Sequence, residues 1–237
     1  MGQRRAATPT KSRGRSRAAR WLLRLLLVLL LGPLVPIVAF RFLPVPLTPL
    51  MLVRLVEGYG LHRTWVDFDR ISPPLVRAVI ASEDNFFCRE PLGIDTSALL
   101  DQLEAWQSGD RARGASTITM QTTRNLLLWP GRDVLRKVLE LWLTPQLALL
   151  WPKQRVLEVY LNIIEFGPGI YGIEAASQHY FRTHASDMTT EQATRLAVIL
   201  PAPLQWSASH PNDTVLERAR IIRRRVGELG SLLDCAR

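Results

Sequence analysis

A basic N-terminal stretch that runs directly into an apolar segment constrains this chain more than any other feature of its sequence. The first 20 residues contain seven Lys and Arg and no acidic residue. From Leu25 to Phe40 the sequence carries no charge, and flanking apolar residues lengthen the stretch toward the roughly 20 residues that a membrane-spanning helix needs. The pattern predicts a basic tail over residues 1–20 and one transmembrane helix over residues 21–43.

A cleaved signal peptide and a buried core helix are the alternatives for this segment. A signal peptidase site needs small residues after the apolar run, whereas Arg41, Phe42 and two prolines follow here. A buried core helix is disfavoured, because the seven cations of the tail would lie directly at its N-terminal end. We therefore expect a retained, single-pass anchor in the cell inner membrane. Because basic flanks stay in the cytoplasm, residues 44–237 are expected in the periplasm.

The positive charge of the chain belongs to the tail. The chain has 30 Lys and Arg against 21 Asp and Glu, a net charge of +9. Without the seven cations of the tail, 23 remain against the same 21 acidic residues. A nucleic-acid binder needs its positive surface on the folded part, so no nucleic-acid partner is expected. A DNA-binding role for the tail would require it to be free of the membrane.

Cysteine and histidine residues give little support for a metal site or a disulfide. Cys88 and Cys235 lie far apart, and nothing near either favours a bridge, so we expect two separate thiols. Pairing in an oxidising compartment is the alternative. The four histidines are scattered without the spacing of zinc ligands, and we interpret them as structural or solvated.

The remainder, residues 44–237, is predicted to be one mainly α-helical domain. Ser72 followed by two prolines is typical of a helix start, and Thr189 with Gln192 forms a capping box. Pro145 is expected to bend or end the first half of its helix. The expected helices cover about residues 72–84, 96–105, 119–128, 133–150, 152–164, 189–200 and 214–229. Residues 44–52 are predicted to be a connector against the membrane, and residues 109–114 a polar break.

Glu83 and Asp84 stand where the first helix of the domain ends, followed by Phe86 and Phe87. The helix dipole disfavours negative charge at a C-terminus, and residues that break a local rule tend to mark functional sites. One of two crowded carboxyls near aromatic rings is a candidate for a raised pKa and for general-base catalysis. A solvated acidic turn is the alternative.

Arg136, Lys137 and Glu140 are spaced to lie on one face of a helix. They form a candidate cationic clamp for a phosphate or pyrophosphate, with a carboxylate beside it. A surface salt-bridge cluster is the alternative.

Residues 114–121 are rich in small and hydroxyl side chains, and Arg111 and Arg113 precede them. Such a segment can bind sugar hydroxyls or phosphates through backbone N–H groups and side chains. A flexible polar loop is the alternative. Tyr160 and Asn162 add a polar pair near the end of a later apolar helix.

Together these segments resemble the peptidoglycan glycosyltransferases of family 51. These occur as the first domain of bifunctional penicillin-binding proteins and as stand-alone monofunctional enzymes. The resemblance covers roughly residues 47–229 and rests on five motifs in the expected order. The motifs are Glu83-Asp84-x-x-Phe87 with Gly93 and Asp95; Gly114–Ile118 with Gln121, Asn125 and Leu126; Arg136-Lys137-x-x-Glu140; Lys153 with Leu157, Glu158, Tyr160, Leu161 and Asn162; and Gly172-Ile173-x-Ala175-Ala176.

The resemblance implies a lysozyme-like helical fold with a membrane-proximal apolar region. It also implies polymerisation of lipid II into glycan strands through β-1,4 bonds, with release of undecaprenyl pyrophosphate. Glu83 would be the catalytic base, and Glu140 a second catalytic residue beside Arg136 and Lys137, which neutralise the leaving group. The substrate-binding residues that it implies are Asp84, Phe87, Arg113, Ser116, Thr117, Gln121, Asn125, Arg136, Lys137 and Asn162.

The implied ligands and partners follow from the same resemblance. They are lipid II, the nascent glycan strand, the membrane, and proteins of cell division or elongation. A divalent cation, Mg²⁺ or Mn²⁺, would assist near Glu140, and no organic cofactor is expected. Because only residues 230–237 follow the last expected helix, we expect a monofunctional enzyme.

The sequence departs from the family pattern in residues 88–92. Five residues separate Phe87 from Gly93 where the pattern has four, and the usual His is absent. Met120 also stands where Gln is frequent. The loop motivates an alternative, a catalytically weak or inactive membrane-anchored scaffold. A lytic transglycosylase or muramidase on the same kind of fold is the other alternative, although it would have no use for the Arg136 and Lys137 clamp.

Overall fold

A helical domain and a long N-terminal helical segment make up the chain in a computed structural model, which describes residues 13–108, 114, 116–131 and 133–236. The helices are α1 (Arg13–Leu31), α2 (Leu34–Phe42), α3 (Pro49–Val56), α4 (Pro73–Glu83), α5 (Thr96–Ser108), α6 (Ile118–Leu127), α7 (Val134–Leu150), α8 (Lys153–Ile163), α9 (Ile173–Phe181), α10 (Thr190–Ile199) and α11 (Asp213–Leu229). Short 3₁₀ helices are η1 (Phe68–Arg70), η2 (Phe87–Arg89), η3 (Ala185–Asp187) and η4 (Gly230–Ala236).

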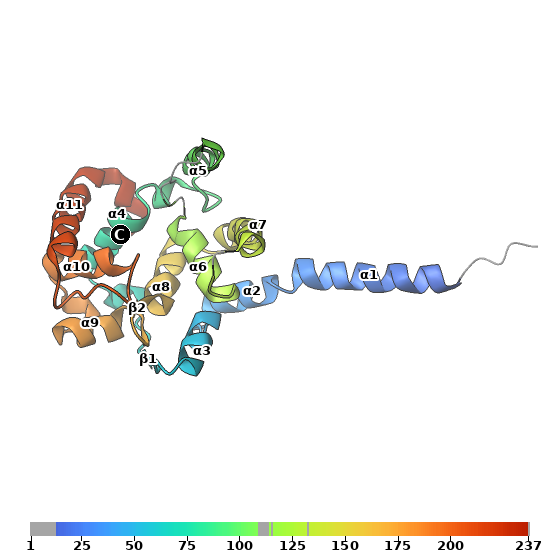
Figure 1. Ribbon diagram of the computed structural model, residues 1–237, viewed down its shortest axis with the longest axis horizontal. Helices are drawn as coiled ribbons and strands as arrows, with labels where there is room; N and C mark the ends of the chain where they lie inside the picture. The colour runs from blue at the N-terminus through green and yellow to red at the C-terminus, as the bar shows by residue number, and fades with distance from the viewer. Residues whose placement is uncertain (1–12, 109–113, 115, 132, 237) are drawn as a thin grey trace, which may run out of the picture.

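The N-terminal segment projects away from the domain (Figure 1). Ala19–Phe42, which covers most of α1 and all of α2, is long and apolar enough to cross a membrane. The helix begins at Arg13, inside the stretch predicted to be a basic tail, and residues 1–12 lie outside the described part. The C-terminal part of α2 is attached to the domain. The indole N–H of Trp151 donates to the carbonyl of Ile37 at 2.7 Å, and Arg155 donates to that of Phe40.

The core is formed by two groups of helices, and η4 packs against α4 of one group and α8 of the other. In one group α4 packs against α10 and α11, and in the other α6 packs against α7 and α8. Leu75, Ile80, Leu157 and Ile199 are all fully buried. Because α4 is held on several sides, the residue at its C-terminal end, Glu83, has a fixed position between the two groups.

A small sheet closes the edge of the domain beside α3 and α9. Its order is β1 (His62–Arg63), β3 (Ile170–Tyr171), β2 (Glu165–Gly167), with β1 and β3 parallel and β2 and β3 antiparallel. Gly169 in the β2–β3 turn has φ +69°, and a Cβ there would lie 2.1 Å from the carbonyl oxygen of Tyr59. Only glycine fits this close approach.

The predicted mainly α-helical fold is confirmed, but α9 and the small sheet were not among the predicted elements, and two features of the predicted helices differ. Asp133 caps α7 and the Thr189–Gln192 capping box is present, but Ser72 makes no side-chain capping bond at α4. Pro145 does not end its helix, since α7 runs through it to Leu150. Proline removes one backbone bond, and buried Leu143 and Leu147 on either side keep both halves packed.

The expectation of two separate thiols is wrong, because Cys88 and Cys235 form a disulfide. Their Cα atoms lie 5.4 Å apart. After Gly230 the chain turns back as η4, which buries Leu233 in the core and packs against η2. This tertiary return brings together two residues that are distant in sequence.

Candidate active site

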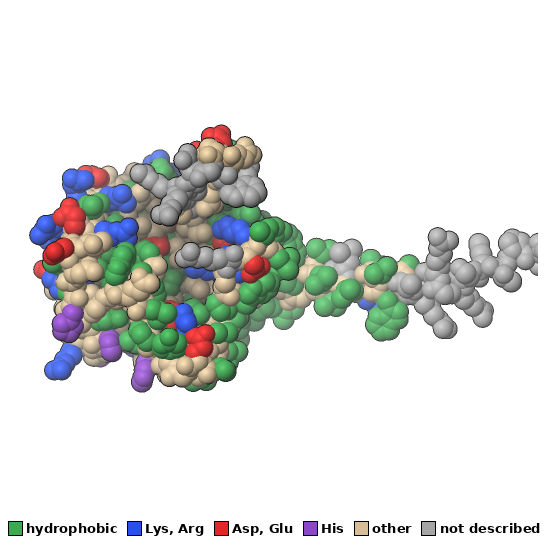
Figure 2. All heavy atoms as spheres, in the orientation of Figure 1, with side chains coloured by type: hydrophobic (Ala, Val, Ile, Leu, Met, Phe, Trp, Pro, Cys, Tyr) green, Lys and Arg blue, Asp and Glu red, His purple; other side chains and the backbone are tan. Residues whose placement is uncertain are grey.

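A cavity of about 1180 Å³ opens among α3, α6, α7 and β2. Figure 2 shows Lys and Arg side chains gathered on this face beside α6 and α7, and apolar side chains covering the part next to the N-terminal helix. The predicted site residues Ser116, Asn125, Arg136 and Lys137 line the cavity. Residues from two of the sequence motifs therefore meet at one place.

Glu83 ends α4 with its carboxylate partly buried and bonded on both oxygens. The Gln121 side chain donates to Oε2 at 2.9 Å, and the Ser82 hydroxyl donates to Oε1 at 3.3 Å. Burial raises the pKa of Glu83 above its ordinary value, while the two donors and the charge of Arg124 act against that rise. Gln121 in turn accepts from the hydroxyl of fully buried Tyr160 at 3.1 Å, so the carboxylate is held by a chain of side chains.

Asp84 connects α4 to the start of α6. Its Oδ2 accepts from the backbone N–H of Ile118 at 2.9 Å, and the Thr117 hydroxyl caps the same helix by accepting from Met120. Burial raises the pKa of Asp84 to about 6, and the backbone N–H of Ile118 and the charge of Lys153 partly offset that rise. Asp84 and Thr117 therefore orient the helix that carries Gln121, and both are buried.

The cationic clamp is a buried cluster centred on Glu140. This carboxylate is fully buried and paired with Arg136 on one oxygen and with Lys137 Nζ at 2.8 Å on the other. Lys137 also donates to the Ser116 hydroxyl at 3.1 Å. Two cations share one carboxylate, so the cluster keeps a net positive charge at the cavity wall. The buried Nε of Arg136 has no hydrogen-bond partner among the described residues.

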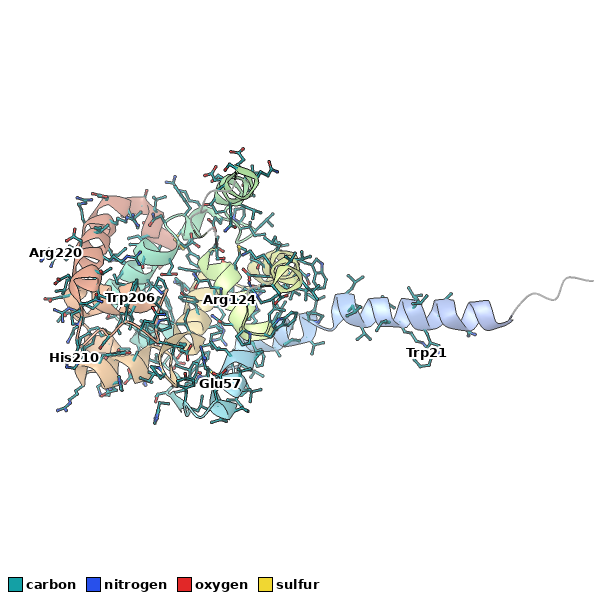
Figure 3. The ribbon with its side chains drawn as sticks, viewed as in Figure 1. Trp21, Glu57, Arg124, Trp206, His210 and Arg220 are labelled. Carbon is teal, nitrogen blue, oxygen red and sulfur yellow. A yellow bond between two sulfur atoms is a disulfide. The ribbon has the colours of Figure 1, made fainter. Side chains whose placement is uncertain are left out.

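Arg124 is a cavity residue that the sequence analysis missed. It lines the cavity from α6, one turn after Gln121, and its charge acts on Glu83. Glu83 is not among the described residues that line the cavity, whereas Arg124, labelled in Figure 3, lines it and acts on Glu83 through its charge. Its position between Gln121 and Asn125 on one amphipathic helix was the available signal.

Of the predicted substrate-binding residues in the described part of the chain, those that do not line the cavity are Asp84, Phe87, Thr117, Gln121 and Asn162. Phe87 is fully buried beneath Lys153, whose Nζ lies 4.4 Å from the ring centre. Asn162 is fully buried, accepts from Val66 N–H and donates to Val66 C=O, each at 2.8 Å. Both side chains therefore stabilise the fold. Arg113 lies outside the described residues, as does most of the predicted polar break over residues 109–114.

The loop that departs from the motif buries a carboxyl group. Glu90 is 7 % exposed, and neither carboxyl oxygen has a hydrogen-bond partner among the residues that the structure describes. Burial and the nearby charge of Asp84 raise the pKa of Glu90 to about 8. Lys153 donates to the backbone carbonyl of Glu90 at 2.7 Å, which attaches this loop to α8.

Comparison with known proteins identifies the family to which this arrangement belongs. A family model described as transglycosylase matches residues 51–226. A protein of Caulobacter vibrioides named biosynthetic peptidoglycan transglycosylase is 48% identical over 216 residues, which cover 90% of this chain and 94% of that protein. The chain belongs to the transglycosylase family. Proteins of the same name from Pseudomonas savastanoi pv. phaseolicola and Bdellovibrio bacteriovorus are 44% and 41% identical, over 89% and 87% of this chain and 92% and 85% of their own lengths.

The geometry of this transglycosylase suits attack on a carbon that bears a phosphate leaving group. A carboxylate with a raised pKa can accept a proton near neutral pH. A cluster of fixed cations can stabilise the charge that develops on a departing pyrophosphate.

The described residues contain no cluster of three or more metal-ligating side chains, and assistance by Mg²⁺ or Mn²⁺ near Glu140 stays a prediction. Mg²⁺ and Mn²⁺ prefer clustered oxygen ligands. Among the described residues, no group of three or more His, Cys, Asp or Glu side chains is placed to hold a metal ion. Glu140, where the sequence analysis expected metal assistance, is occupied by Arg136 and Lys137.

Proposed function

We propose that this chain polymerises lipid II into the glycan strands of peptidoglycan. The observation that carries the proposal is that Arg124, whose charge acts on Glu83, lines the same cavity as Arg136 and Lys137 of the Glu140-centred cluster. The names of the relatives and the family membership support the same reaction class.

In this mechanism the Glu83 carboxylate accepts the proton of the 4-hydroxyl of the acceptor sugar. The hydroxyl oxygen attacks the anomeric carbon of the donor and forms the β-1,4 bond, while the bond from that carbon to the pyrophosphate oxygen breaks. Undecaprenyl pyrophosphate leaves with the bonding electron pair. Arg136, Lys137 and Arg124 stabilise its negative charge, so the leaving group needs no strong general acid.

The N-terminal segment supports the assignment of a lipid-linked substrate. Ala19–Phe42 is a candidate membrane span, and Trp151 and Arg155 attach its C-terminal end to the domain. We propose that the span anchors the domain at the periplasmic surface of the inner membrane, with the basic N-terminus in the cytoplasm. An enzyme held at that surface can bind a lipid-linked sugar while the lipid tail of that sugar stays in the bilayer.

A lytic transglycosylase is the second enzyme class that the fold allows. Cleavage of polymeric glycan releases no pyrophosphate, so the buried Glu140 cluster would have no charge to stabilise. The cluster is unlike an ordinary surface salt bridge, because its carboxylate is fully buried. It therefore favours synthesis over cleavage.

The test is polymerisation of labelled lipid II by the full chain in detergent, with products resolved by size. Glu83→Gln is expected to lower the rate by about 10²- to 10⁴-fold, the range for loss of a general base. Glu191→Gln, an exposed carboxylate paired with Arg195 on α10, is the matched control and should retain activity. Absence of polymer from folded wild-type protein would reject the proposal in favour of a scaffold.

A further inference from the structure

The Cys88–Cys235 disulfide ties the C-terminal end of the chain to the loop that follows the candidate base. Cys88 lies in η2, shortly after Glu83, and Cys235 lies in η4. η4 packs against η2 and α4, and the C-terminus lies beside α4 in Figure 1. Leu233 of η4 is buried in the core. The last segment of the chain therefore supports the loop over residues 84–93 from outside.

This loop holds the C-terminal end of α4 against the N-terminal end of α6. At one end of the loop, Asp84 accepts from the backbone N–H of Ile118 at 2.9 Å. At its other end, the carbonyl of Gly93 accepts from the hydroxyl of Thr117 at 2.6 Å. Because α4 carries the candidate base and α6 carries the amide that donates to it, the 2.9 Å hydrogen bond between those two side chains depends on the position of the loop.

The loop also buries a group that favours its opening. The carboxyl group of Glu90 is buried, and neither of its oxygens has a hydrogen-bond partner among the described residues. Burial of an unpaired carboxyl group costs free energy, which would be recovered if the loop moved outward into solvent. The nearby charge of Asp84 adds to this cost. The hydrogen bond from Lys153 to the Glu90 carbonyl at 2.7 Å and the disulfide both oppose the movement, and reduction removes the disulfide.

We propose that the disulfide is a positioning link for catalysis: when oxidised it holds the base in place, and its reduction to two thiols lets the loop open and lowers turnover. The inference rests on the proposed function, because the activity that is lost is lipid II polymerisation. The cavity residues Arg124, Arg136 and Lys137 lie on α6 and α7, whereas η4 packs against η2, α4, α8 and α11. Reduction should therefore lower kcat, through the orientation of Glu83, and leave KM near its value in the oxidised protein.

The redox step is a thiol–disulfide exchange with a dithiol. One thiolate of the dithiol attacks a sulfur of the bridge and forms a mixed disulfide, and the second thiolate then releases the chain from it. The dithiol loses two electrons and becomes a cyclic disulfide, and its two protons go to the thiols of Cys88 and Cys235. Both cysteines are partly exposed, so a small dithiol can reach the bridge.

Lipid II polymerisation by the full chain in detergent, before and after complete reduction with dithiothreitol, tests the link. The assay runs below the Tm of both forms, and titration of thiols confirms each state. We expect kcat to fall by roughly tenfold to a hundredfold on reduction, the effect of a displaced catalytic group, while KM stays near its oxidised value. Reoxidation should restore kcat. Cys88→Ser/Cys235→Ser should have the kcat of the reduced wild type and no response to dithiothreitol.

Two further variants separate positioning from a general loss of stability. Met188→Ala deletes a buried side chain that contacts Ser177 of α9, so it should lower the Tm and keep the wild-type kcat below that Tm. Glu90→Gln replaces the buried carboxyl group by a neutral amide, so reduction should lower its kcat less than that of the wild type. Unchanged kcat of the wild type on reduction, an equal loss of kcat in Met188→Ala, or an equal response of Glu90→Gln to reduction would overturn the proposal.

The outcomes also separate this inference from the proposed function. Active oxidised wild type whose kcat does not respond to reduction would reject the positioning link alone. Absence of polymer from folded, oxidised wild type would reject the function on which the inference depends.

Discussion

Gln121 donates to the carboxylate of Glu83 at 2.9 Å and so fixes the orientation of the candidate base. The same amide accepts from Tyr160 at 3.1 Å, which determines which end of the amide faces Glu83. A donor to the ionised form of a carboxyl lowers its pKa, whereas burial raises it. The working pKa of Glu83 is therefore a balance that single substitutions on α6 can shift.

The first prediction concerns the pH dependence of catalysis. A general base must be ionised, so kcat/KM should rise with pH through the pKa of Glu83, and this acidic limb should lie above pH 4.5. Gln121→Leu removes a donor that lowers the pKa, so its acidic limb should move to higher pH. The profile is measured by polymerisation rates at limiting lipid II. Gln178→Leu, an exposed side chain on α9, is the control, and an unmoved limb in Gln121→Leu would contradict this role.

The second prediction concerns Glu90 and the stability of the fold. Its pKa is about 8 in the folded chain against 4.5 for the ordinary group. Between these values only the unfolded chain loses the proton, so wild-type stability should fall as pH rises from 4.5 to about 8 and level off above that. The Glu90→Gln variant has no carboxyl group at this position, so this fall of stability with rising pH should be absent.

The corresponding measurement is thermal unfolding in detergent at about pH 4 and about pH 9. The Tm of Glu90→Gln relative to wild type should be higher at the alkaline pH than at the acidic pH. The exposed Glu191→Gln should show no such difference between the two values. A Tm difference independent of pH would mean that the Glu90 carboxyl is solvated.

The third prediction concerns the disulfide between Cys88 and Cys235. The bridge closes a long segment of chain, so its loss should reduce the free energy of unfolding by about 2–4 kcal/mol. Chemical unfolding of the wild type with and without dithiothreitol measures this. In Cys88→Ser/Cys235→Ser the reductant should have no effect. Two titratable thiols in native wild-type protein purified without reductant would contradict the bridge.

Features specified by local sequence were predicted well. The capping box at Thr189, the cap at Asp133 and the placement of Glu83 at the end of α4 depend on residues within one or two turns. Periodicity also placed Arg136, Lys137 and Glu140 on one face, although the sequence could not show that the carboxylate is fully buried.

Features that depend on distant contacts were missed. Cys235 reaches Cys88 only because η4 folds back onto the loop after α4, and no residue near either cysteine encodes that return. Arg54 lines the cavity because α3 packs against α6, a contact that helical periodicity does not predict. A motif also does not reveal that Phe87 and Asn162 are fully buried, because burial depends on the elements that pack around them.

Asn162 leads to the last prediction, in which stability and substrate binding respond separately. Its side chain pairs with both backbone groups of Val66 and donates to the carbonyl of Glu158 at 2.7 Å, away from the cavity. Asn162→Ala leaves buried backbone groups unpaired, so the free energy of unfolding should fall by roughly 2–4 kcal/mol. Below its Tm the variant should keep the wild-type KM for lipid II.

Lys137→Ala should show the reverse pattern. Lys137 is partly exposed at the cavity wall, and Arg136 still pairs with Glu140 when it is removed. The Tm of Lys137→Ala should therefore change little. Its kcat/KM should fall by roughly tenfold or more, because one cation facing the leaving group is lost. Steady-state kinetics and thermal melts on the two variants, prepared in parallel, give the kinetic constants and the Tm of each. A raised KM in Asn162→Ala at a temperature where it is fully folded would place that side chain back among the substrate contacts.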